Sequence, residues 1–511
     1  MKHPRITWSI IGIIVIYAII SQSLVFLNWD ASWLLRCSEK ILEGKHYYTS
    51  FIETNPPLII WIGVIPVFFS KLLHLSVDST FRSFIFFLSG VSLSVLYFLY
   101  KRLFAENKKP YLDVVFSVTT FVLLIAPSLA FGEREHICTI LTMPYFFLTA
   151  LLLRKKKVSQ NLRFFIGVWA GLGFLIKPYF LLAFLLNEAY VLIKTKKLAS
   201  IFRIETISII ILGCLYCLAM FVFEPNYLFK VLPLVFALYL PFGHSGLLFC
   251  LEYNTAYIWF FILALSFWQG SKDSYGSTIR ILQLATIAFL GSYYWQNRGP
   301  YYHILPALSY GMILIAMLLT ENGALLISDK KRFGRDLKST MQTLILIFLI
   351  LACILPVLFK TNYGSFWLGF SKKSYVYQGG RLAQAFQYRG RVLIVTENIM
   401  IQESVLKSTN LKSVTREPAL ILESSLFYAH ENHWFEHNAR FKAMSSEAKA
   451  LFLADISRHQ PGMIVTLKKE QALFKYLLTW PQFKAYFSQF HYAGQRGGYR
   501  VYLKSPETIK N

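Results

Sequence analysis

The residues that could carry chemistry gather in a few short stretches of an otherwise apolar chain. The first stretch, Asn28–Trp61, holds Asp30, Glu39, Glu43 and Glu53, four of the chain's 27 acidic residues. A carboxylate can deprotonate a hydroxyl group or bind a divalent cation. Asp30 is therefore a candidate catalytic residue, and Glu53 is the candidate for a second acid or a metal ligand.

Each of these acids also has a structural interpretation. Asp30 precedes Ala31–Leu42, a predicted surface helix, and aspartate is a favoured N-cap residue. Glu53 could be a solvated charge in a loop. Asn55 stands before two prolines, which fix φ and force it into extended backbone, so we expect a sharp turn into Leu58–Leu75. Asn55 is thereby also a candidate substrate or metal contact.

A second stretch, "FGEREH", concentrates three charges and a histidine between two apolar runs. Arg134 suits a phosphate group. Glu133, Glu135 or His136 could bind a metal or a substrate. The competing interpretation is a salt-bridge cluster whose charges neutralise one another. No metal-ligand spacing such as HExxH is present, so the sequence does not identify a metal.

Three further basic residues complete the candidate set. Lys177 lies between two apolar segments and is either a lysine that extends to the membrane surface or a phosphate ligand. Arg298 and His303, with Tyr302, lie in "WQNRGPYYH" and could complete a phosphate site. The competing interpretation of the tyrosines is that they anchor the chain at the membrane interface.

The composition decides what kind of element must position these residues. The 511-residue chain is 55% hydrophobic, 17% aromatic and only 15% charged, with a mean hydropathy of +0.47. A soluble protein of this size could not cover so much apolar surface with so few charges. Runs of about 18–20 apolar residues recur and predict transmembrane helices. The first, Trp8–Leu27, is long for a signal peptide and lacks a small-x-small cleavage site, so we interpret it as an uncleaved span.

The net charge of +25 is distributed in a way that argues against nucleic-acid binding. Basic residues bunch in short tracts between apolar segments, which is typical of cytoplasmic loops. All tracts fall inside only if Pro57–Leu75 lies along the outer surface and does not span. The tracts are Lys101-Arg102 with Lys108-Lys109, Arg154–Lys157, Lys194 with Lys196-Lys197, and Lys330–Arg332 with Arg335 and Lys338.

The sequence therefore predicts a polytopic α-helical membrane protein of about 11 transmembrane helices, with its N-terminus inside and its C-terminus outside. The predicted spans are Trp8–Leu27, Phe81–Tyr100, Leu112–Phe131, Ile137–Leu153, Leu162–Ile176, Tyr179–Ile193, Ile204–Phe223, Thr255–Trp268, Ile279–Trp295, Tyr302–Leu319 and Met341–Phe359. On this topology all the candidate residues fall on the outer face. That convergence is the main argument for a site there.

The chain divides into two predicted domains, a transmembrane module of residues 1–359 and an extracytoplasmic domain of residues 360–511. Within the module, the outer loop 28–79 carries surface helices, and Glu224–Gly246 is too rich in proline to span and is expected at the interface. The second domain is predicted to be a small α/β domain, because short apolar runs typical of strands alternate with more polar segments that have helical spacing. Its expected strands and helices are Val392–Val395, Met463–Val465, Tyr499–Leu503, Ser445–Arg458 and Glu470–Leu478.

At motif level the chain resembles the GT-C glycosyltransferases, the membrane enzymes that include protein O-mannosyltransferases (glycosyltransferase family 39) and lipid A aminoarabinose transferases. The resemblance starts with an Asp just after the first span. Many relatives carry an Asp-Glu pair there, whereas here Asp30 is followed by Ala31, so a second acid must come from elsewhere. The matching residues are Leu42, Glu43, Gly44, Tyr47, Tyr48, Phe51, Glu53, Asn55, Pro56, Pro57 and Trp61, then Gly132–His136 and Arg298–Ala307.

The resemblance implies an inverting hexosyl- or pentosyltransferase at the outer face of a bacterial cytoplasmic membrane. Its donor would be a polyprenyl-phosphate sugar and its acceptor a lipid, glycan or protein. It implies that Arg134, Lys177, Arg298 and His303 bind the donor phosphate, and it leaves open a divalent cation, Mn²⁺ or Mg²⁺. A flippase or transporter of lipid-linked glycans and an oligosaccharide ligase are the alternatives. A transporter would usually show intramembrane charges and an internal repeat, and neither is evident.

Overall fold

The computed structural model describes residues 4–104, 109–242, 246–253, 256–269, 275–328, 371–372, 374–407, 411–433 and 439–505. The chain forms two compact units, each assembled from segments far apart in the sequence. The bundle unit comprises Met1–Phe26, His74–Leu218 and Ser245–Ser365, and the sheet unit comprises Leu27–Leu73, Ala219–His244 and Phe366–Asn511. The predicted division between residues 359 and 360 falls outside the described residues.

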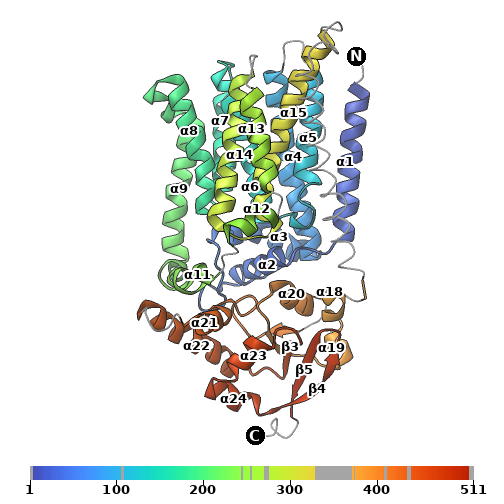
Figure 1. The fold of residues 1–511 in the computed structure, drawn as a ribbon, viewed down its shortest axis with the longest axis vertical. Coiled ribbons are helices and arrows are strands. Elements are labelled where there is room, and N and C mark those ends of the chain that lie inside the picture. Colours follow the sequence, from blue (N-terminus) through green and yellow to red (C-terminus); the bar gives the residue numbers. More distant parts are fainter. Residues whose placement is uncertain are drawn as a thin grey trace. The chain divides into compact units, whose positions relative to one another are not determined.

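The bundle unit consists of helices that run side by side (Figure 1). The last residues of α9 belong to the sheet unit. Short 3-10 segments are labelled η. The elements are α1 (Pro4–Leu24), α4 (Val77–Leu103), α5 (Lys109–Leu124), η1 (Ser128–Ala130), α6 (Arg134–Leu153), α7 (Gln160–Phe174), η2 (Pro178–Phe180), α8 (Leu181–Thr195), η3 (Leu198–Phe202), α9 (Ile204–Phe223), α12 (Leu247–Tyr253), α13 (Ala256–Gln269), α14 (Gly276–Gln296), η6 (Tyr301–Ile304) and α15 (Leu305–Ser328).

The predicted spans coincide with these helices wherever the structure describes them. Each predicted span from Trp8–Leu27 to Tyr302–Leu319 overlaps one helix, whereas Met341–Phe359 lies outside the described residues. Among the described residues, five helices are both long and apolar enough to cross a membrane. The chain is thus an integral membrane protein, and its full number of spans and their orientation stay predictions.

Burial separates the centre of the bundle unit from its rim. The most apolar windows of α6 and of the segment Tyr301–Thr320 are 89% buried, against 17% for α1 and 22% for α9. A helix that is apolar all round and exposed on one side is what a bilayer, as opposed to water, stabilises. The elements α6 and α15 therefore form the core, and the polar groups within these two windows lie largely inside protein.

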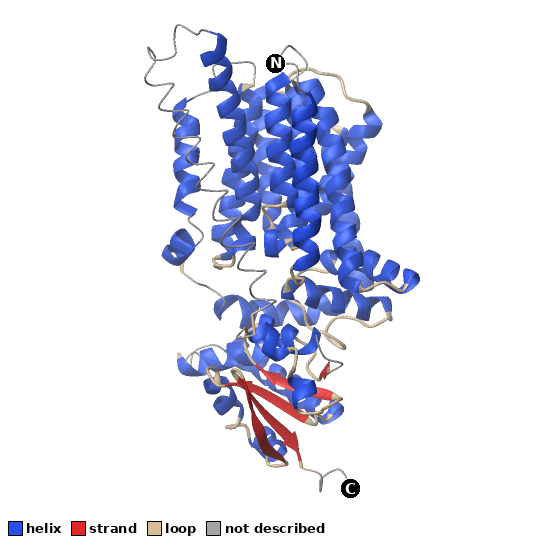
Figure 2. Ribbon diagram, turned by 90° about the vertical axis from the view of Figure 1, so that its right-hand side faces the viewer, coloured by secondary structure: helices blue, strands red, loops and turns tan. Residues whose placement is uncertain are grey.

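The sheet unit combines a mixed sheet with helices (Figure 2). Its helices are α2 (Trp29–Leu42), α3 (Leu58–Leu73), α10 (Leu232–Leu234), α11 (Leu240–Phe242), α18 (Tyr375–Gly379), α19 (Leu382–Ala385), α20 (Ile399–Lys407), α21 (Ile421–Glu431), α22 (Ala439–His459), α23 (Gln471–Leu477) and α24 (Pro481–Phe487), with π-helical segments η4 (Tyr227–Val231) and η5 (Val235–Tyr239). Its strands are β1 (Arg391–Val395), β2 (Lys412–Ser413), β3 (Met463–Leu467), β4 (Phe490–Arg496) and β5 (Tyr499–Lys504).

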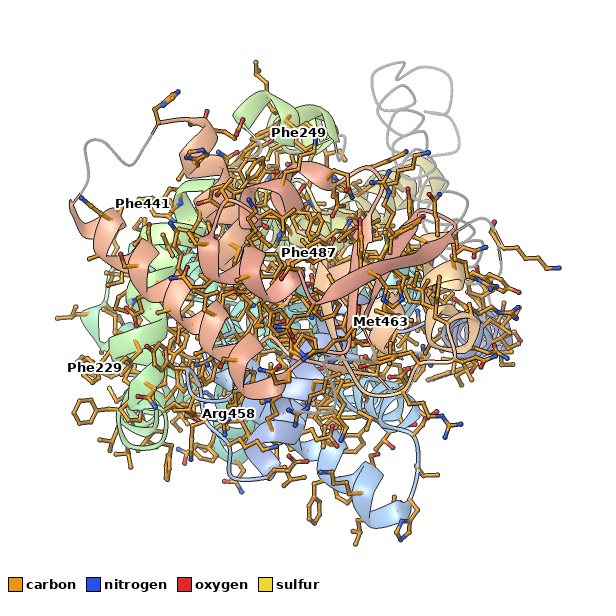
Figure 3. The ribbon with its side chains drawn as sticks, turned by 90° about the horizontal axis from the view of Figure 1, so that it is seen from below. Phe229, Phe249, Phe441, Arg458, Met463 and Phe487 are labelled. Atoms are coloured by element: carbon orange, nitrogen blue, oxygen red, sulfur yellow. The ribbon has the colours of Figure 1, made fainter. Side chains whose placement is uncertain are left out.

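The strand order is β2-β1-β3-β5-β4, with β1 parallel to β2 and β3 and the β3–β5–β4 portion antiparallel. The predicted strands and helices of the C-terminal segment are confirmed. The strands β2 and β4 and the helices α18, α19, α20, α21 and α24 were not predicted. The strand β4 is largely exposed, so it lacks the apolar run by which the others were found. It is joined to β5 through Gly497, whose φ of +58° favours glycine. Figure 3 labels Met463 of β3 and Phe487 of α24, which belong to this unit.

The segment Glu224–Gly246 is helical throughout most of its length, not an irregular loop. It alternates single α-helical turns with the π-helical segments η4 and η5, an arrangement that is rare and is often associated with functional sites. It packs on α21 and α22 of the same unit and also contacts Tyr47. The prediction that it lies in the membrane interface is not tested by these contacts.

Candidate active site

The turn before α6 is fixed by its own residues. Gly132 has a φ of +83°, and a Cβ there would meet the Phe81 ring at 2.4 Å, so only glycine fits. The Gly132 N–H donates to His136 Nδ1 (3.0 Å), and His136 Nε2 donates to the Leu123 carbonyl (2.8 Å). Both ring nitrogens of His136 are thus bonded to backbone. This corrects the expectation that His136 binds a metal or the sugar: its ring holds the turn instead.

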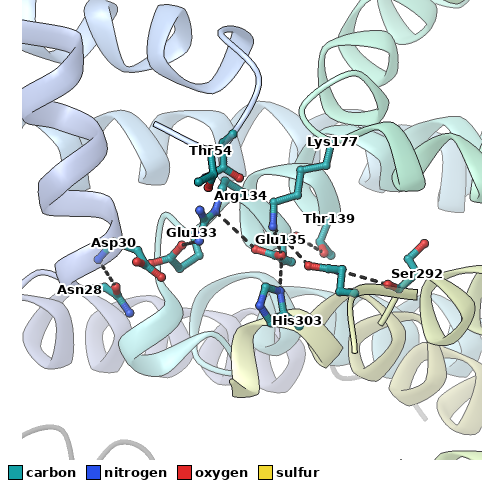
Figure 4. A network of polar contacts seen from close by, with 12 residues as sticks. Asn28, Asp30, Thr54, Glu133, Arg134, Glu135, Thr139, Lys177, Ser292 and His303 are labelled. Carbon is teal, nitrogen blue, oxygen red and sulfur yellow. Dashed lines mark hydrogen bonds and ion pairs between the residues drawn. The ribbon is translucent and has the colours of Figure 1, made fainter. Parts of the chain in front are cut away.

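Glu135 lies at the centre of a buried cluster of charges in the bundle unit (Figure 4). Its Oε1 accepts hydrogen bonds from Lys177 Nζ (2.7 Å) and from His303 Nδ1 (2.8 Å). The exposed fractions are 0% for Glu135, 4% for Lys177 and 5% for His303. Glu135 is therefore engaged with two basic groups, which makes it a positioning residue for them and leaves a direct metal or sugar contact unsupported.

Lys177 is held in place from several sides. It precedes Pro178, which keeps it extended (φ −140°), and its ammonium lies 5.4 Å from the centre of the Tyr179 ring. Gln296 Oε1 accepts from Lys177 Nζ (3.4 Å) and from the Tyr179 hydroxyl (2.7 Å). A lysine that extends to the membrane surface would be exposed, so that interpretation is wrong. Burial lowers the pKa of Lys177 to about 8, although Glu135 opposes the shift.

Arg134 extends the cluster. Its guanidinium donates to Glu133 Oε2 (3.2 Å), and its centre lies 5.4 Å from the centre of the Tyr302 ring. Glu133 is fully buried and Arg134 is 6% exposed. The predicted neutralising cluster is thus present, but it is not confined to one loop. Its members come from the start of α6, the turn before η2, and η6.

The cluster has a position that favours an anion. The described charges balance if His303 is neutral, because Arg134 and Lys177 match Glu133 and Glu135. The cluster lies at the N-termini of α6 and of η6 with α15, where unpaired N–H groups and the helix dipole attract negative charge. Arg298 follows the C-terminal end of α14 and is half-buried, and its phosphate role stays a prediction.

The cluster and the basic tract Arg154–Lys157 occupy opposite ends of α6. The helix α6 begins at Arg134 and ends at Leu153, immediately before the tract Arg154–Lys157. Its 20 residues correspond to about 30 Å, which is the thickness of the hydrocarbon core of a bilayer. A cluster at one membrane face and basic tracts at the other is what the predicted topology requires.

The sheet unit carries the acids of the first outer loop. Asn28 is the N-cap of α2, and its Oδ1 accepts from the Asp30 N–H (2.8 Å) (Figure 4). The capping interpretation of Asp30 is therefore wrong, since Asn28 performs that role. Asp30 lies in the first turn of α2, is half-buried, and has a carboxylate that the helix dipole stabilises.

Glu53 is a buried carboxylate, not a solvated loop charge. It is 3% exposed. Its Oε2 accepts from Trp33 Nε1 (2.6 Å), and its Oε1 accepts from the Asn55 N–H (2.7 Å) and from the Asn55 side-chain amide. The Asn55 carbonyl in turn accepts from the Tyr47 hydroxyl (3.0 Å). Glu53 therefore ties α2 to the turn before α3, and Asn55 supports the same turn.

Several residues of these two clusters were not found from the sequence. Gln296 and Tyr179 bind the Lys177 region, Trp33 binds Glu53, and Glu224 accepts from the Tyr47 N–H (3.2 Å) and pairs with His46 (3.1 Å). Burial raises the pKa of Glu224, and the bond to His46 opposes this. Only Gln296 left a sequence signal, as an amide at the end of an apolar run, where polar groups are costly.

Among the residues that the structure describes, no group of three or more His, Cys, Asp or Glu side chains could hold a metal ion. Both oxygens of Glu53, Oε1 of Glu135 and both ring nitrogens of His136 are hydrogen-bonded within the protein. The donor set seen here does not fit a metal, and no chemical step is assigned to one.

Comparisons with known proteins agree at the level of fold. No model of a protein family and no curated protein sequence matches the chain. The structure of ArnT from Cupriavidus metallidurans in the apo state matches with a TM-score of 0.55 at 13% identity, covering 98% of this chain and 97% of that one. ArnT is an aminoarabinose transferase of the GT-C superfamily. This chain has the GT-C fold.

Two other structures resemble this GT-C fold. ArnT from the same organism bound to undecaprenyl phosphate gives a TM-score of 0.55 at 12% identity, covering 97% of both chains. An oligosaccharyltransferase of Archaeoglobus fulgidus, in complex with Zn and sulfate, gives a TM-score of 0.43 at 14% identity, covering 97% of this chain and 73% of that one. The match to ArnT confirms, for the fold of the chain, the GT-C resemblance that the motifs indicated.

Proposed function

We propose that this protein is a membrane glycosyltransferase that moves a sugar from a polyprenyl-phosphate donor to an acceptor at the outer face of a bacterial cytoplasmic membrane. The observation that carries the proposal is the buried Lys177–Glu135–His303 cluster with Arg134, at the N-termini of core helices in a GT-C fold. The ArnT structure bound to undecaprenyl phosphate supports a lipid of that class.

In this proposal the basic residues receive the leaving group. Lys177 and Arg134 hold the donor phosphate, with His303 and Arg298 completing the set, because a phosphate leaving with an electron pair needs hydrogen-bond donors placed in advance. Glu135 keeps Lys177 and His303 in position. An ammonium has three N–H donors. Two are directed at Glu135 and Gln296, and the third remains for the phosphate.

Asp30 is the proposed general base. It takes the proton of the acceptor hydroxyl as the acceptor oxygen forms a bond to C1 of the sugar. The bond between C1 and the phosphate oxygen breaks, and the polyprenyl phosphate leaves with the electron pair. A single displacement inverts the configuration at C1, as the GT-C resemblance implies. Glu53 and Asn55 set the shape of the turn beside α2, and Glu53 is a positioning residue, not a second base.

The test is transfer of labelled sugar from a panel of polyprenyl-phosphate sugars by the purified protein, with native lipid and glycan extract as acceptor. Asp30→Asn is compared with wild type and with Asp78→Asn, another acid in the first turn of a helix. Both variants are first checked for unchanged thermal unfolding. We expect Asp30→Asn to lose at least about 100-fold in activity, within the range for removal of a general base, and Asp78→Asn to keep it.

Other outcomes would redirect the proposal. Full activity of folded Asp30→Asn would show that Asp30 is not the base. Activity that disappears without Mn²⁺ or Mg²⁺ would make Asp30 a metal ligand. Transfer of whole oligosaccharides alone would indicate a ligase. Movement of the donor across vesicles without transfer would indicate a flippase.

A further inference from the structure

A groove of about 590 Å³ lies within the bundle unit, between α1, α4 and α5. The helix α1 packs on α5, and α5 packs on α4, so the side of α4 that faces α1 is left partly open. A volume of this size is in the range of small-molecule and lipid sites. None of the residues lining the groove belongs to the charge cluster around Glu135.

The two ends of the groove differ in polarity. Its polar end is lined by Gln22 and Ser23 of α1 and by Ser79, Arg82 and Ser83 of α4. Because α1 runs toward its C-terminus where α4 begins, these polar residues meet at one end.

The opposite end of the groove is apolar. There it is lined by Val15 and Ile19 of α1 and by Phe86, Gly90 and Leu93 of α4. A cleft that is polar at one end and apolar along the rest has the shape of an amphiphile.

Arg82 supplies the charge at the polar end. Its Nη2 donates to the Val25 carbonyl (2.6 Å), whereas its Nε is buried and has no hydrogen-bond partner in the described part of the chain. A buried guanidinium N–H without a partner is costly and is satisfied best by an anion such as a phosphate. Asp78, one turn earlier on α4, is the acid whose charge acts on Arg82.

The length of the groove suits a lipid of one leaflet. From Ser79 to Leu93, α4 rises about 21 Å at 1.5 Å per residue. Half of a bilayer's hydrocarbon core is about 15 Å. The groove therefore accommodates a headgroup phosphate and one acyl chain that ends near the middle of the bilayer, which favours a phospholipid over a long polyprenyl chain.

We propose that this groove binds one membrane phospholipid, with its phosphate at Arg82 and an acyl chain along Phe86, Gly90 and Leu93. The lipid completes the packing of α1, which is otherwise the least buried of the five long apolar helices. Gln22 Nε2 donates to the Ser128 carbonyl (3.0 Å), so the groove wall also touches the segment leading to Gly132. The site does not depend on the proposed transferase activity.

The test measures bound lipid and not activity. Wild type, Gly90→Leu, Arg82→Gln and Gly12→Leu are purified in mild detergent, and bound phosphatidylglycerol is measured by native mass spectrometry during titration. A Cβ at Gly90 meets nothing within 4 Å, so a leucine there fills the groove without a clash, and Gly12 on α1 is equally open but does not line the groove. Leucine also favours a helix over glycine, so both variants should fold.

We expect wild type and Gly12→Leu to bind one phosphatidylglycerol per chain. Gly90→Leu and Arg82→Gln should each bind it at least about tenfold more weakly, which corresponds to about 1.4 kcal/mol. Thermal unfolding should show the same order, since a ligand that binds only the folded state raises stability. Equal binding by Gly90→Leu and wild type would overturn the proposal. So would binding of polyprenyl phosphate alone, with no competition from phosphatidylglycerol.

Discussion

Two buried carboxylates, Glu135 in the bundle unit and Glu53 in the sheet unit, make an instructive comparison. Both were candidate acids by type and position, and both are almost fully buried. Glu135 accepts from the basic groups Lys177 and His303, whereas Glu53 accepts from the neutral N–H groups of Trp33 and Asn55. The partners, not the burial, separate their roles.

The difference follows from what each carboxylate stabilises. A carboxylate between cations keeps them charged and in place, so that they can receive a second anion. A carboxylate held by neutral donors fixes the backbone that carries those donors. We therefore expect the Glu135 region to respond mainly in activity and the Glu53 region mainly in stability.

The largest effect should come from Lys177→Met. Removing the ammonium leaves Glu135 with one fewer cation in a buried site, which typically costs about 3–5 kcal/mol of unfolding free energy. Transfer should fall at least about 100-fold, as when one preorganised donor to a developing negative charge is removed. Thermal unfolding and the labelled-sugar assay measure the two effects.

The double variant Lys177→Met/Glu135→Gln separates them. It removes the orphaned carboxylate, so we expect part of the stability to return while activity stays lost. Recovery of activity together with stability would mean that Lys177 acts only by neutralising Glu135.

Glu53→Gln should have a smaller effect than Lys177→Met, and the effect should be mainly on stability and not on activity. A glutamine cannot accept from both Trp33 and Asn55 without placing its own NH₂ against one of these donors, so we expect a loss of about 1–3 kcal/mol. Activity at a temperature where the protein is folded should fall less than activity of Lys177→Met. The matched control is Glu39→Gln, an exposed acid on α2, within about 0.5 kcal/mol of wild type. A fully stable Glu53→Gln protein without activity would instead make Glu53 catalytic.

The pH dependence should show Lys177 directly. If the donor phosphate needs the Lys177 cation, kcat/KM falls as pH rises through about 8, approaching tenfold per pH unit above it. Stability should have the opposite sign. The folded pKa lies below the ordinary lysine value, so between the two the unfolded state binds more protons and this group raises stability with pH. Lys177→Arg should move the fall in kcat/KM to higher pH, and a fall that stays near pH 8 would assign it to another group.

The smallest expected effects are the changes in stability caused by substituting Asn28 and Asp30, and they should distinguish the capping residue from its neighbour. Asn28→Ala removes the N-cap of α2 and should cost about 1 kcal/mol. Asp30→Asn keeps this cap and loses a favourable interaction of its carboxylate with the helix dipole, about 0.3–1 kcal/mol. Differential scanning fluorimetry of both variants orders them. A larger loss in Asp30→Asn would return Asp30 to a structural role.

Much of the architecture could be predicted because it depends on local patterns. The apolar runs gave the helices of the bundle unit, and the alternating short runs gave β1, β3 and β5. The basic tract Arg154–Lys157 marked the end of α6 that lies opposite to the Glu135 cluster. The sequence also marked Arg134, Lys177 and His303 as one set, although only by their common side of the predicted membrane.

Which of these side chains bind one another could not be predicted from the sequence. Glu135 and His303 are 168 positions apart, and Lys177 and Gln296 are 119 apart. No spacing rule joins residues at such separation, because their meeting depends on how α6, α14 and α15 pack. The same is true of Glu53, whose burial follows from the packing of α2 on α3 and not from its polar neighbours in the chain.

The sequence by itself determined that this is a membrane protein of many apolar helices joined by basic loops. It also indicated a small α/β segment near the C-terminal end and a short set of candidate acidic and basic residues. Hydropathy and charge bias are properties of each segment separately, so they can be evaluated without knowledge of the fold. Only the tertiary structure decided which of those candidate side chains are already hydrogen-bonded within the protein. It assigned His136 and Glu53 to backbone and side-chain donors of the turns and gave Asn28 the cap of α2. It paired Lys177 with Glu135 and Gln296 and left one N–H donor of its ammonium for a ligand, because hydrogen-bond partners are set by where helices meet.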